Sequence, residues 1–236
     1  MIAITFALPT ESSNLIALLQ GKKRADAKAA VIHGKIGNRS VTIFHTGVGA
    51  KACADKIDNF LRAAHPEFLI SSGFAGSVCE DWNVGDLLLC ENFSDRRLLL
   101  QAQRALSARH PWVGRMFTST SIVDSLAERN EIARADGADA VDMETELVAQ
   151  ACARHGVPLL SLRVISDTPR QPFPAPPNVL FDIERQRTNA TKFMAYFLRH
   201  PARVIRLFRF ARRVSRARRV LTDALVTLVP QLGPNE

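Results

Sequence analysis

Apolar runs of strand length alternate along most of the chain with segments of helical periodicity. The strand-like runs show little polar alternation, which is typical of strands covered on both faces. This alternation predicts an α/β fold in which helices cover both faces of a sheet. The predicted strands are 2–8, 31–36, 41–45, 68–71, 84–90, 138–143 and 158–166, with another near Met116. A hairpin turn is predicted at Gly37-Asn38, between the second and third of these strands. The predicted helices are 12–20, a segment ending at Ala64 because His65 precedes a proline, 98–109, a segment ending at Ile132, and 144–155.

Proline and arginine mark a different organisation after residue 168. Five of the twelve prolines lie within 169–177, which indicates an extended linker. From Arg203 onward, apolar residues recur at steps of three and four while arginines take the other side of a helix. We therefore predict an α/β domain over 1–168, a Pro-rich linker over 169–182 and a basic amphipathic helical extension over 183–236. The apolar positions of that helix are Val204, Leu207, Phe208, Ala211, Val214, Leu221, Leu225 and Leu228.

The net charge of +8 is concentrated in the same tail. Nine arginines lie within 199–219, whereas residues 1–198 contain 22 basic and 21 acidic residues. A nucleic-acid partner is not expected, because the body is nearly neutral and Phe208 and Phe210 belong to the apolar face instead of forming stacking platforms. Two interpretations of the tail remain: its apolar face packs on the body, or residues 199–229 bind an anionic membrane surface.

The remaining composition points to a cytoplasmic protein, with peripheral contact to the inner face of a membrane through the tail. The N-terminus lacks the basic flank of a signal peptide, and no apolar run is long enough to span a bilayer. The cysteines form no CxxC pair, which predicts reduced, buried thiols and no zinc site. We expect neither a metal nor a cofactor. The four cysteines are Cys53, Cys79, Cys90 and Cys152.

Polar residues follow four predicted strands at their carboxyl ends, where open α/β sheets bind ligands. Because buried carboxyl groups are costly without partners, a cluster of them is more typical of a functional site than of chance. If these strands are neighbours, three carboxylates and a glycine-containing turn converge. The residues are Glu11, the segment Ser72-Gly73-Phe74-Ala75-Gly76, Asp142 with Glu144, and Ser166 with Asp167.

Each of these residues also has a purely structural interpretation. Glu11 fits the first turn of a helix, where the helix dipole favours an acid. Asp142 and Glu144 fit a solvated helix start, and Asp167 fits a turn that leads into a proline. The segment 47–49 (Gly-Val-Gly) lacks the third glycine of a dinucleotide site and the lysine of a P-loop.

Taken in order, five segments resemble the nucleoside phosphorylase and nucleosidase superfamily, in particular the methylthioadenosine/S-adenosylhomocysteine nucleosidases. They are 7–11 (ALPTE), 46–49 (TGVG), 72–76 (SGFAG), 141–144 (VDME) and 163–167 (RVISD). The resemblance covers roughly residues 2–168. It implies a three-layer, mixed central sheet flanked by helices, cleavage of the N-glycosidic bond of a purine nucleoside, and a homodimer.

The resemblance also assigns roles to single residues. Asp167 would protonate the purine N7 while Ser166 holds its side chain, and Glu11 would deprotonate the attacking water. Glu144 would bind the ribose hydroxyls, with Met143 packed against the sugar. This division of labour requires a protonated Asp167 and an ionised Glu11 near neutral pH. The other expected substrate-binding residues are Val48, Phe74, Ala75, Gly76 and Val123.

Some positions depart from the nucleosidase pattern. Leu8 replaces the usual Met, Phe74 replaces a small hydroxyl residue, and Val123 stands where an aromatic side chain packs on the purine. These changes put the usual soluble substrates in doubt and leave the cleavage chemistry intact. Phosphorylases of the superfamily place an arginine close after the first strand, and 9–14 contains none, which favours hydrolysis. Phosphorolysis remains the alternative, with phosphate held by Arg39, Arg96 or Arg97.

The tail carries a second resemblance, to the hopanoid-associated phosphorylases. Its matching features are Pro176-Pro177, the segment 197–201 (FLRHP) and the arginine-rich helix that follows. The resemblance implies release of adenine from adenosylhopane, a nucleoside attached to a lipid, in hopanoid biosynthesis. A non-catalytic nucleoside-binding protein at a membrane is the last alternative, and the presence of Glu11, Glu144 and Asp167 argues against it.

Overall fold

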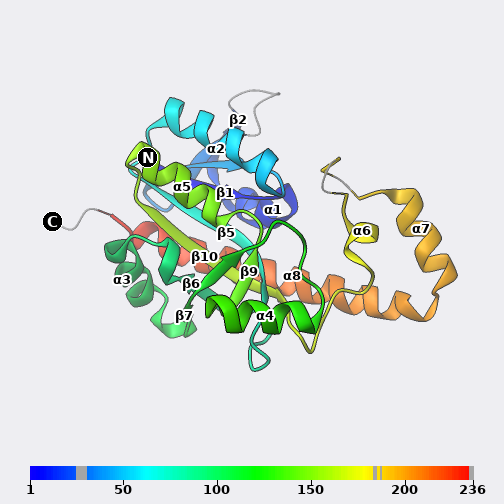
Figure 1. The fold of residues 1–236 in the computed structure, drawn as a ribbon. Helices are drawn as coiled ribbons and strands as arrows, with labels where there is room; N and C mark the ends of the chain where they lie inside the picture. The colour runs from blue at the N-terminus through cyan, green and yellow to red at the C-terminus, as the bar shows by residue number, and fades with distance from the viewer. Residues whose placement is uncertain (25–30, 183–184, 187, 234–236) are drawn as a thin grey trace.

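The computed structural model describes residues 1–24, 31–182, 185–186 and 188–233 (Figure 1). Its strands are β1 (Ile2–Phe6), β2 (Gln20–Arg24), β3 (Ile32–Ile36), β4 (Arg39–His45), β5 (Phe68–Ser77), β6 (Leu87–Cys90), β7 (Trp112–Gly114), β8 (Met116–Thr118), β9 (Ala140–Asp142) and β10 (Leu159–Asp167). Its α-helices are α1 (Pro9–Leu18), α2 (Ala50–Ala64), α3 (Arg96–Ala105), α4 (Leu126–Asp136), α5 (Thr145–His155), α6 (Pro177–Leu180), α7 (Ala190–Arg199) and α8 (Ala202–Leu228).

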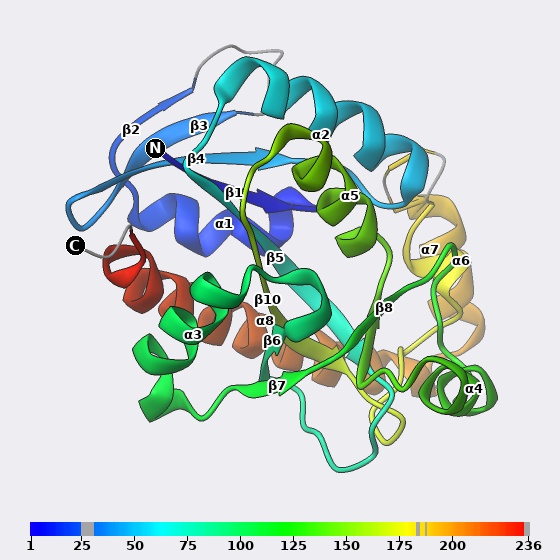
Figure 2. The ribbon, with the colours of Figure 1, turned by 60° about the vertical axis from the view of Figure 1, so that its left-hand side comes forward.

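The strands form one mixed sheet in the order β2-β3-β4-β1-β5-β10-β6-β7, and β9 joins β5 to β8. The central pairs β4–β1, β1–β5 and β5–β10 are parallel, whereas β3 and β6 run antiparallel to their neighbours β4 and β10. In β1, Ile2 and Ile4 pack toward α1 and α8, while Ala3 packs toward α2 and α5. Helices therefore cover both faces (Figure 2), which confirms the predicted three-layer α/β fold.

Several local predictions are confirmed, and one is wrong. The hairpin around Gly37-Asn38 joins β3 to β4, and α2 ends at His65, in a left-handed conformation directly before Pro66. The segment 72–76 is not a turn after a strand, because β5 continues through it to Ser77. Pairing with β10 and with the short strand β9 keeps the segment extended.

The C-terminal helix α8 has two halves with different surroundings. Its second half belongs to the main hydrophobic core beneath the sheet, so the interpretation that the tail packs on the body holds for this half. The prediction of a membrane surface over 199–229 is therefore wrong for the apolar residues of 217–229 that are buried in this core; Val226 lies outside the core and is 37% exposed. Residue 183, where the extension was expected to begin, lies outside the described residues. The core residues of this half are Ala217, Leu221, Ala224, Leu225, Leu228 and Val229.

The first half of α8 projects from the body together with α7 (Figure 1). Phe208, expected on the buried face of the helix, is 67% exposed. The opposite side chains of this half, among them Leu207 and Phe210, line a pocket that reaches the sheet. In the described part of the chain, no helix has the length and apolar character needed to cross a membrane. Cys53, Cys90 and Cys152 are buried, and Cys79 is partly exposed.

Candidate active site

The three predicted carboxyl groups lie around one pocket at the carboxyl ends of the central strands. Glu11 is in the first turn of α1, directly after β1, and Glu144 precedes the first turn of α5. Asp167 ends β10, opposite Gly76 of β5. All three side chains line a cavity of about 570 Å³. The order of the parallel strands β1, β5 and β10 explains the convergence of Glu11 and Asp167 at this edge of the sheet. Glu144 reaches the pocket by another route, because it follows β9, which runs antiparallel to β5.

Glu11 is held by backbone donors in a buried position. The Leu8 N–H donates to Glu11 Oε2 at 2.8 Å and the Phe74 N–H donates to Oε1 at 2.9 Å. Burial raises the pKa of Glu11, and these hydrogen bonds act in the opposite direction. Glu11 therefore occupies the expected helix-start position and also lines the pocket: one oxygen accepts from the backbone at the start of α1, and the other accepts from the backbone of β5.

Two glycines of β5 make room for the carboxyl groups. A Cβ atom on Gly73 would lie 2.9 Å from Glu11 Oε1, and one on Gly76 would lie 2.9 Å from Asp167 Oδ2. Gly73 also has a φ of 152°, which L-residues rarely adopt. The backbone of β5 can thus approach both acids at distances that a side chain would block.

Asp167 forms a buried ion pair with an arginine. Arg129, on α4, has no exposed surface and donates to Asp167 Oδ2. Arg129 also donates to the Ser77 carbonyl at 2.5 Å and to the Val123 carbonyl at 3.1 Å. The Ser166 hydroxyl donates to Asp167 Oδ1 at 2.7 Å. Both carboxylate oxygens of Asp167 therefore accept hydrogen bonds, and a cation that the sequence did not indicate lies against this acid.

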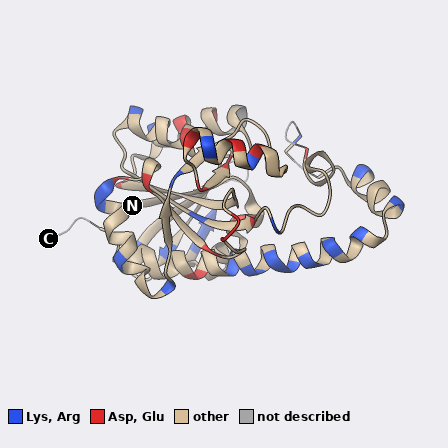
Figure 3. Ribbon diagram, turned by 60° about the horizontal axis from the view of Figure 1, so that its bottom comes forward, with Lys and Arg blue, Asp and Glu red and all other residues tan. Residues whose placement is uncertain are grey.

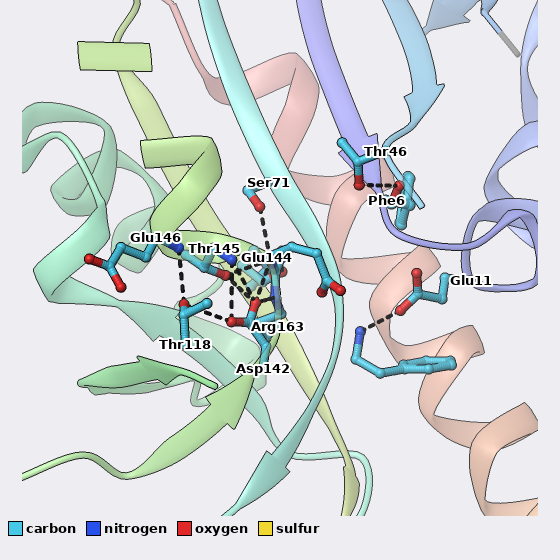
Figure 4. Close-up of polar contacts among 12 residues, drawn as sticks. Phe6, Glu11, Thr46, Ser71, Thr118, Asp142, Glu144, Thr145, Glu146 and Arg163 are labelled. Atoms are coloured by element: carbon cyan, nitrogen blue, oxygen red, sulfur yellow. Dashed lines mark hydrogen bonds and ion pairs between the residues drawn. The ribbon is translucent and has the colours of Figure 1, made fainter. Parts of the chain in front are cut away.

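A second buried ion pair lies beneath Glu144. Arg163 donates from its Nη2 to Asp142 Oδ2 at 3.1 Å and to the Thr145 hydroxyl at 2.7 Å (Figure 4). The Thr118 hydroxyl donates to Asp142 Oδ1 at 3.0 Å. Asp142 is therefore not the solvated helix-start residue that the structural interpretation described. It anchors the start of α5 and so fixes the position of Glu144.

Glu144 lines the pocket, and the pKa of its carboxyl group is raised. Burial, followed by the nearby negative charge of Asp142, raises the pKa of Glu144 to about 8. The Gly49 N–H donates to its Oε1 at 2.8 Å. The adjacent Val48 backbone exchanges two hydrogen bonds of 2.7 Å with the side chain of Gln186. The loop after β4 is thus fixed to Glu144 on one side and to the segment before α7 on the other.

Glu11 and Glu144 also line a small polar cavity. Its volume is about 10 Å³, close to the smallest space that holds one water molecule. The buried hydroxyl oxygens of Thr5 and Ser72, which line it, have no hydrogen-bond partner among the described residues. The cavity therefore offers polar groups to a water-sized ligand next to two carboxyl groups.

The structure brings together the other residues expected to bind substrate. Val123 lines a neighbouring cavity of about 70 Å³, together with Asp167 and Phe173. Arg39, Arg96 and Arg97 do not line these cavities; Arg39 pairs with Glu67, and the other two are exposed on α3. The expected residues that line the large pocket are Val48, Phe74, Ala75, Gly76, Met143 and Ser166.

The outer wall of the large pocket comes from the C-terminal region, which sequence reasoning treated as linker and extension. Phe173, within the Pro-rich segment, contacts Phe210 of α8 with a ring-centroid distance of 5.6 Å. Among the described residues of this wall, Arg218 is the basic one, and it donates to the Thr10 carbonyl at 3.0 Å. The apolar residues of the wall are Phe173, Pro177, Leu180, Phe181, Phe193, Leu207, Phe210, Ala211 and Val214.

Sequence signals for these missed residues were weak. Phe173 lies between two prolines, where an aromatic residue was assigned to a linker, and Arg129 lies on a helix whose charges look solvated. Their roles depend on tertiary contacts that link segments distant in the sequence. Within the described ranges, no group of three or more His, Cys, Asp and Glu side chains is arranged to hold a metal ion.

An α/β sheet that gathers carboxyl groups beneath a largely apolar pocket is the architecture of an enzyme acting on a small molecule. The chain belongs to the phosphorylase superfamily, whose family model matches residues 1–100 and 89–200. This match confirms the superfamily predicted from the five segments.

Known proteins agree with this assignment. A 5'-methylthioadenosine/S-adenosylhomocysteine nucleosidase of Staphylococcus aureus (strain MRSA252) is 26% identical over 203 residues, covering 71% of this chain and 86% of that protein. An S-adenosylhomocysteine nucleosidase from Streptococcus pyogenes, solved with 5-methylthiotubericidin, has a TM-score of 0.74 at 18% identity and covers 98% of this chain and 97% of its own. Futalosine hydrolase of Helicobacter pylori strain 26695 has a TM-score of 0.72 at 17% identity with the same coverage. These structures share the fold.

Proposed function

We propose that this protein is an N-glycosyl hydrolase that cleaves the bond between ribose and adenine in a purine nucleoside. The observation that carries the proposal is the convergence of Glu11, Glu144 and Asp167 on one largely apolar pocket. The sequence relatives and structural neighbours named as nucleosidases or hydrolases support this reaction class.

Asp167 acts on the base in this proposal. It delivers a proton to the purine N7, so that the base leaves as a neutral molecule. In the structure Asp167 is the anion of an ion pair with Arg129, so this step requires Asp167 to gain a proton when the purine is bound. Arg129 and Ser166, which donate to its two oxygens, stabilise the carboxylate that remains after that proton has left. The neighbouring cavity that contains Asp167, Val123 and Phe173 takes the purine, with the Phe173 ring as an aromatic surface beside it.

Glu11 and Glu144 act on the sugar. Glu11 accepts a proton from a water molecule bound in the small polar cavity, and the raised pKa of Glu11 brings this base closer to neutral pH. Glu144 binds the ribose hydroxyls while Met143 packs on the sugar. The positive charge that develops on the sugar ring as the base leaves is stabilised by a nearby carboxylate.

The substrate carries a large apolar group in this proposal, with adenosylhopane as the specific candidate. The pocket has a volume of about 570 Å³, and its outer wall is built from apolar side chains, including Leu180, Phe193 and Leu207. Such a wall favours an apolar substituent, because each buried CH₂ group contributes about 0.8 kcal/mol. The proposal also includes two partners. The protein forms a homodimer, and an anionic membrane is the source of the lipid-linked substrate.

Phosphorolysis is the second candidate, and Arg218 favours it. This arginine lines the pocket and contacts the first turn of α1, which follows β1 and is the region in which phosphorylases of the superfamily place an arginine. A phosphate ion beside Arg218 would replace water as the attacking group.

Release of adenine tests both candidates. Adenosine, methylthioadenosine and adenosylhopane are incubated with the protein with and without phosphate, and the sugar product is identified. Hydrolysis gives the free sugar in both conditions, whereas phosphorolysis requires phosphate and gives a sugar 1-phosphate. Asp167→Asn and Glu11→Gln should each lower the rate at least a hundredfold, on the order expected for a lost acid or base. Glu146→Gln, an exposed neighbour, is the matched control; equal rates in all variants would overturn the assignment.

A further inference from the structure

Four large apolar side chains are exposed where α7 meets α8. Met194 and Leu198 of α7 are 59% and 74% exposed, and Ile205 and Phe208 of α8 are 61% and 67% exposed. We call this surface, formed by α7 and residues 202–216, the α7–α8 corner. It projects from the body of the protein (Figure 1), so these side chains lie away from the sheet and its core.

The first half of α8 presents two different faces. Ile205, Phe208, Arg209 and Arg212 fall on one stripe of the helix, because residues three and four apart share a face, and all four are exposed. Leu207, Phe210 and Val214 fall on the opposite stripe, which lines the large pocket. A single helix thus separates the pocket from an exposed surface that is both apolar and basic.

The charge of the corner restricts its partner. Residues 190–216, which include the corner, contain eight Lys and Arg residues and no acid, and basic residues follow α8 along much of its length (Figure 3). A second copy docked by two-fold symmetry would place arginine against arginine. Exposed aliphatic side chains such as Leu198 and Ile205 offer nothing to a nucleic acid, which is bound by stacking and phosphate contacts. An anionic lipid surface satisfies both the charge and the apolar side chains.

We propose that the α7–α8 corner docks on an anionic membrane, with Met194, Leu198, Ile205 and Phe208 in the interface and the surrounding arginines on lipid headgroups. In this orientation the outer face of α8 contacts the membrane while its inner face contacts the substrate. The apolar part of a lipid-linked nucleoside then passes from the membrane into the pocket beside α8. This route rests on the proposed function for the identity of the substrate; the docking itself does not.

Sedimentation with vesicles tests the docking without substrate. The full chain should sediment with phosphatidylcholine vesicles that contain phosphatidylglycerol, should not sediment with phosphatidylcholine alone, and should bind less in high salt. Arg206→Gln/Arg209→Gln/Arg212→Gln should lower partitioning about a hundredfold, the effect of removing about three charges near an anionic surface. Leu198→Asn/Phe208→Asn should lower it as well, because apolar insertion is lost.

Matched variants on other surfaces serve as controls. Arg96→Gln/Arg97→Gln/Arg104→Gln changes the charge equally on exposed positions of α3, and Leu100→Asn/Leu126→Asn removes two other exposed leucines. Both controls should sediment like the unmodified protein. Loss of binding in the controls as large as in the corner variants would overturn the proposal, as would failure of the unmodified protein to bind anionic vesicles. The proposal would also be overturned if the unmodified protein is a dimer that binds no vesicles and the corner variants are monomers, because the corner would then be a contact between two copies of the chain. Adenine release from soluble adenosine is measured in parallel, so a failed docking and a failed nucleosidase assignment are told apart.

Discussion

Replacing Arg129 with Met removes the cation of the buried pair at the site. The variant leaves the Asp167 carboxylate without its main partner and leaves the carbonyls of Ser77 and Val123 without the hydrogen bonds of 2.5 and 3.1 Å. Removing one member of a buried pair costs about 3–5 kcal/mol, and each unsatisfied buried carbonyl adds about 1 kcal/mol. Since small domains have a free energy of unfolding of about 5–15 kcal/mol, Arg129→Met should lose a large part of its stability.

A double-mutant cycle isolates the charge contribution from the lost volume. Asp167→Asn alone leaves Arg129 buried without an anion and is also destabilising, whereas Arg129→Met/Asp167→Asn removes both charges. The double variant should therefore lose about 2–3 kcal/mol less than the sum of the two single losses, measured as free energies of unfolding in urea. Additivity within about 0.5 kcal/mol would refute the reasoning, because it would mean that the two side chains do not interact in the folded protein.

Three further predictions concern the site and the C-terminal helix. Gly73→Ala should lower the rate of adenine release about a hundredfold, because the new Cβ would lie 2.9 Å from Glu11 Oε1 and would push this carboxyl group out of place. Gly85→Ala is the control: Gly85 also has a positive φ, of 102°, but has open space around it, so this variant should retain activity. Burial raises the pKa of Glu144 to about 8, so the stability that its proton contributes is present below its unfolded-state pKa of 4.5 and is lost as the pH rises through about 8. The urea midpoint of unfolding should decrease as the pH is raised from about 5 to about 8, and Glu144→Gln should make that decrease smaller. An equally large decrease in the variant would show that the Glu144 proton is not its cause. Leu225→Ala, fully buried, should lose about 2–5 kcal/mol, while Ile205→Ala, 61% exposed, should change stability by less than about 0.5 kcal/mol; equal effects would contradict the division of α8 into two halves.

Local sequence signals were sufficient to predict most of the strands and helices of the α/β body. The hairpin at Gly37-Asn38 and the end of α2 before Pro66 follow from turn and proline chemistry, and the apolar runs identify the central strands. The convergence of Glu11 and Asp167 also followed, because parallel strands place their carboxyl ends at one edge. The roles assigned to these residues remain predictions until activity is measured.

Contacts between distant segments were not predictable in this way. Periodicity shows that α8 is amphipathic, but it does not show that residues 217–229 enter the core while Phe208 faces outward. Which apolar positions of a long helix become buried depends on where its neighbours end, and here the sheet covers only the second half. The same limit applies to Arg129, whose partner lies on a strand 38 residues away.

The wrong prediction at 72–76 has a physical cause connected with the site. Glycines inside a strand reduce its stability by roughly 0.5–1 kcal/mol relative to alanine, so local preference favours a turn there. The strand persists because β10 pairs with it in parallel as far as Gly76, and the missing side chains are the spaces that Glu11 and Asp167 occupy. A position that violates local preference and yet makes room for two buried acids is where function is expected to outweigh stability. It follows that alanine at Gly76 should disturb Asp167 as alanine at Gly73 disturbs Glu11, with loss of activity larger than loss of stability in both variants.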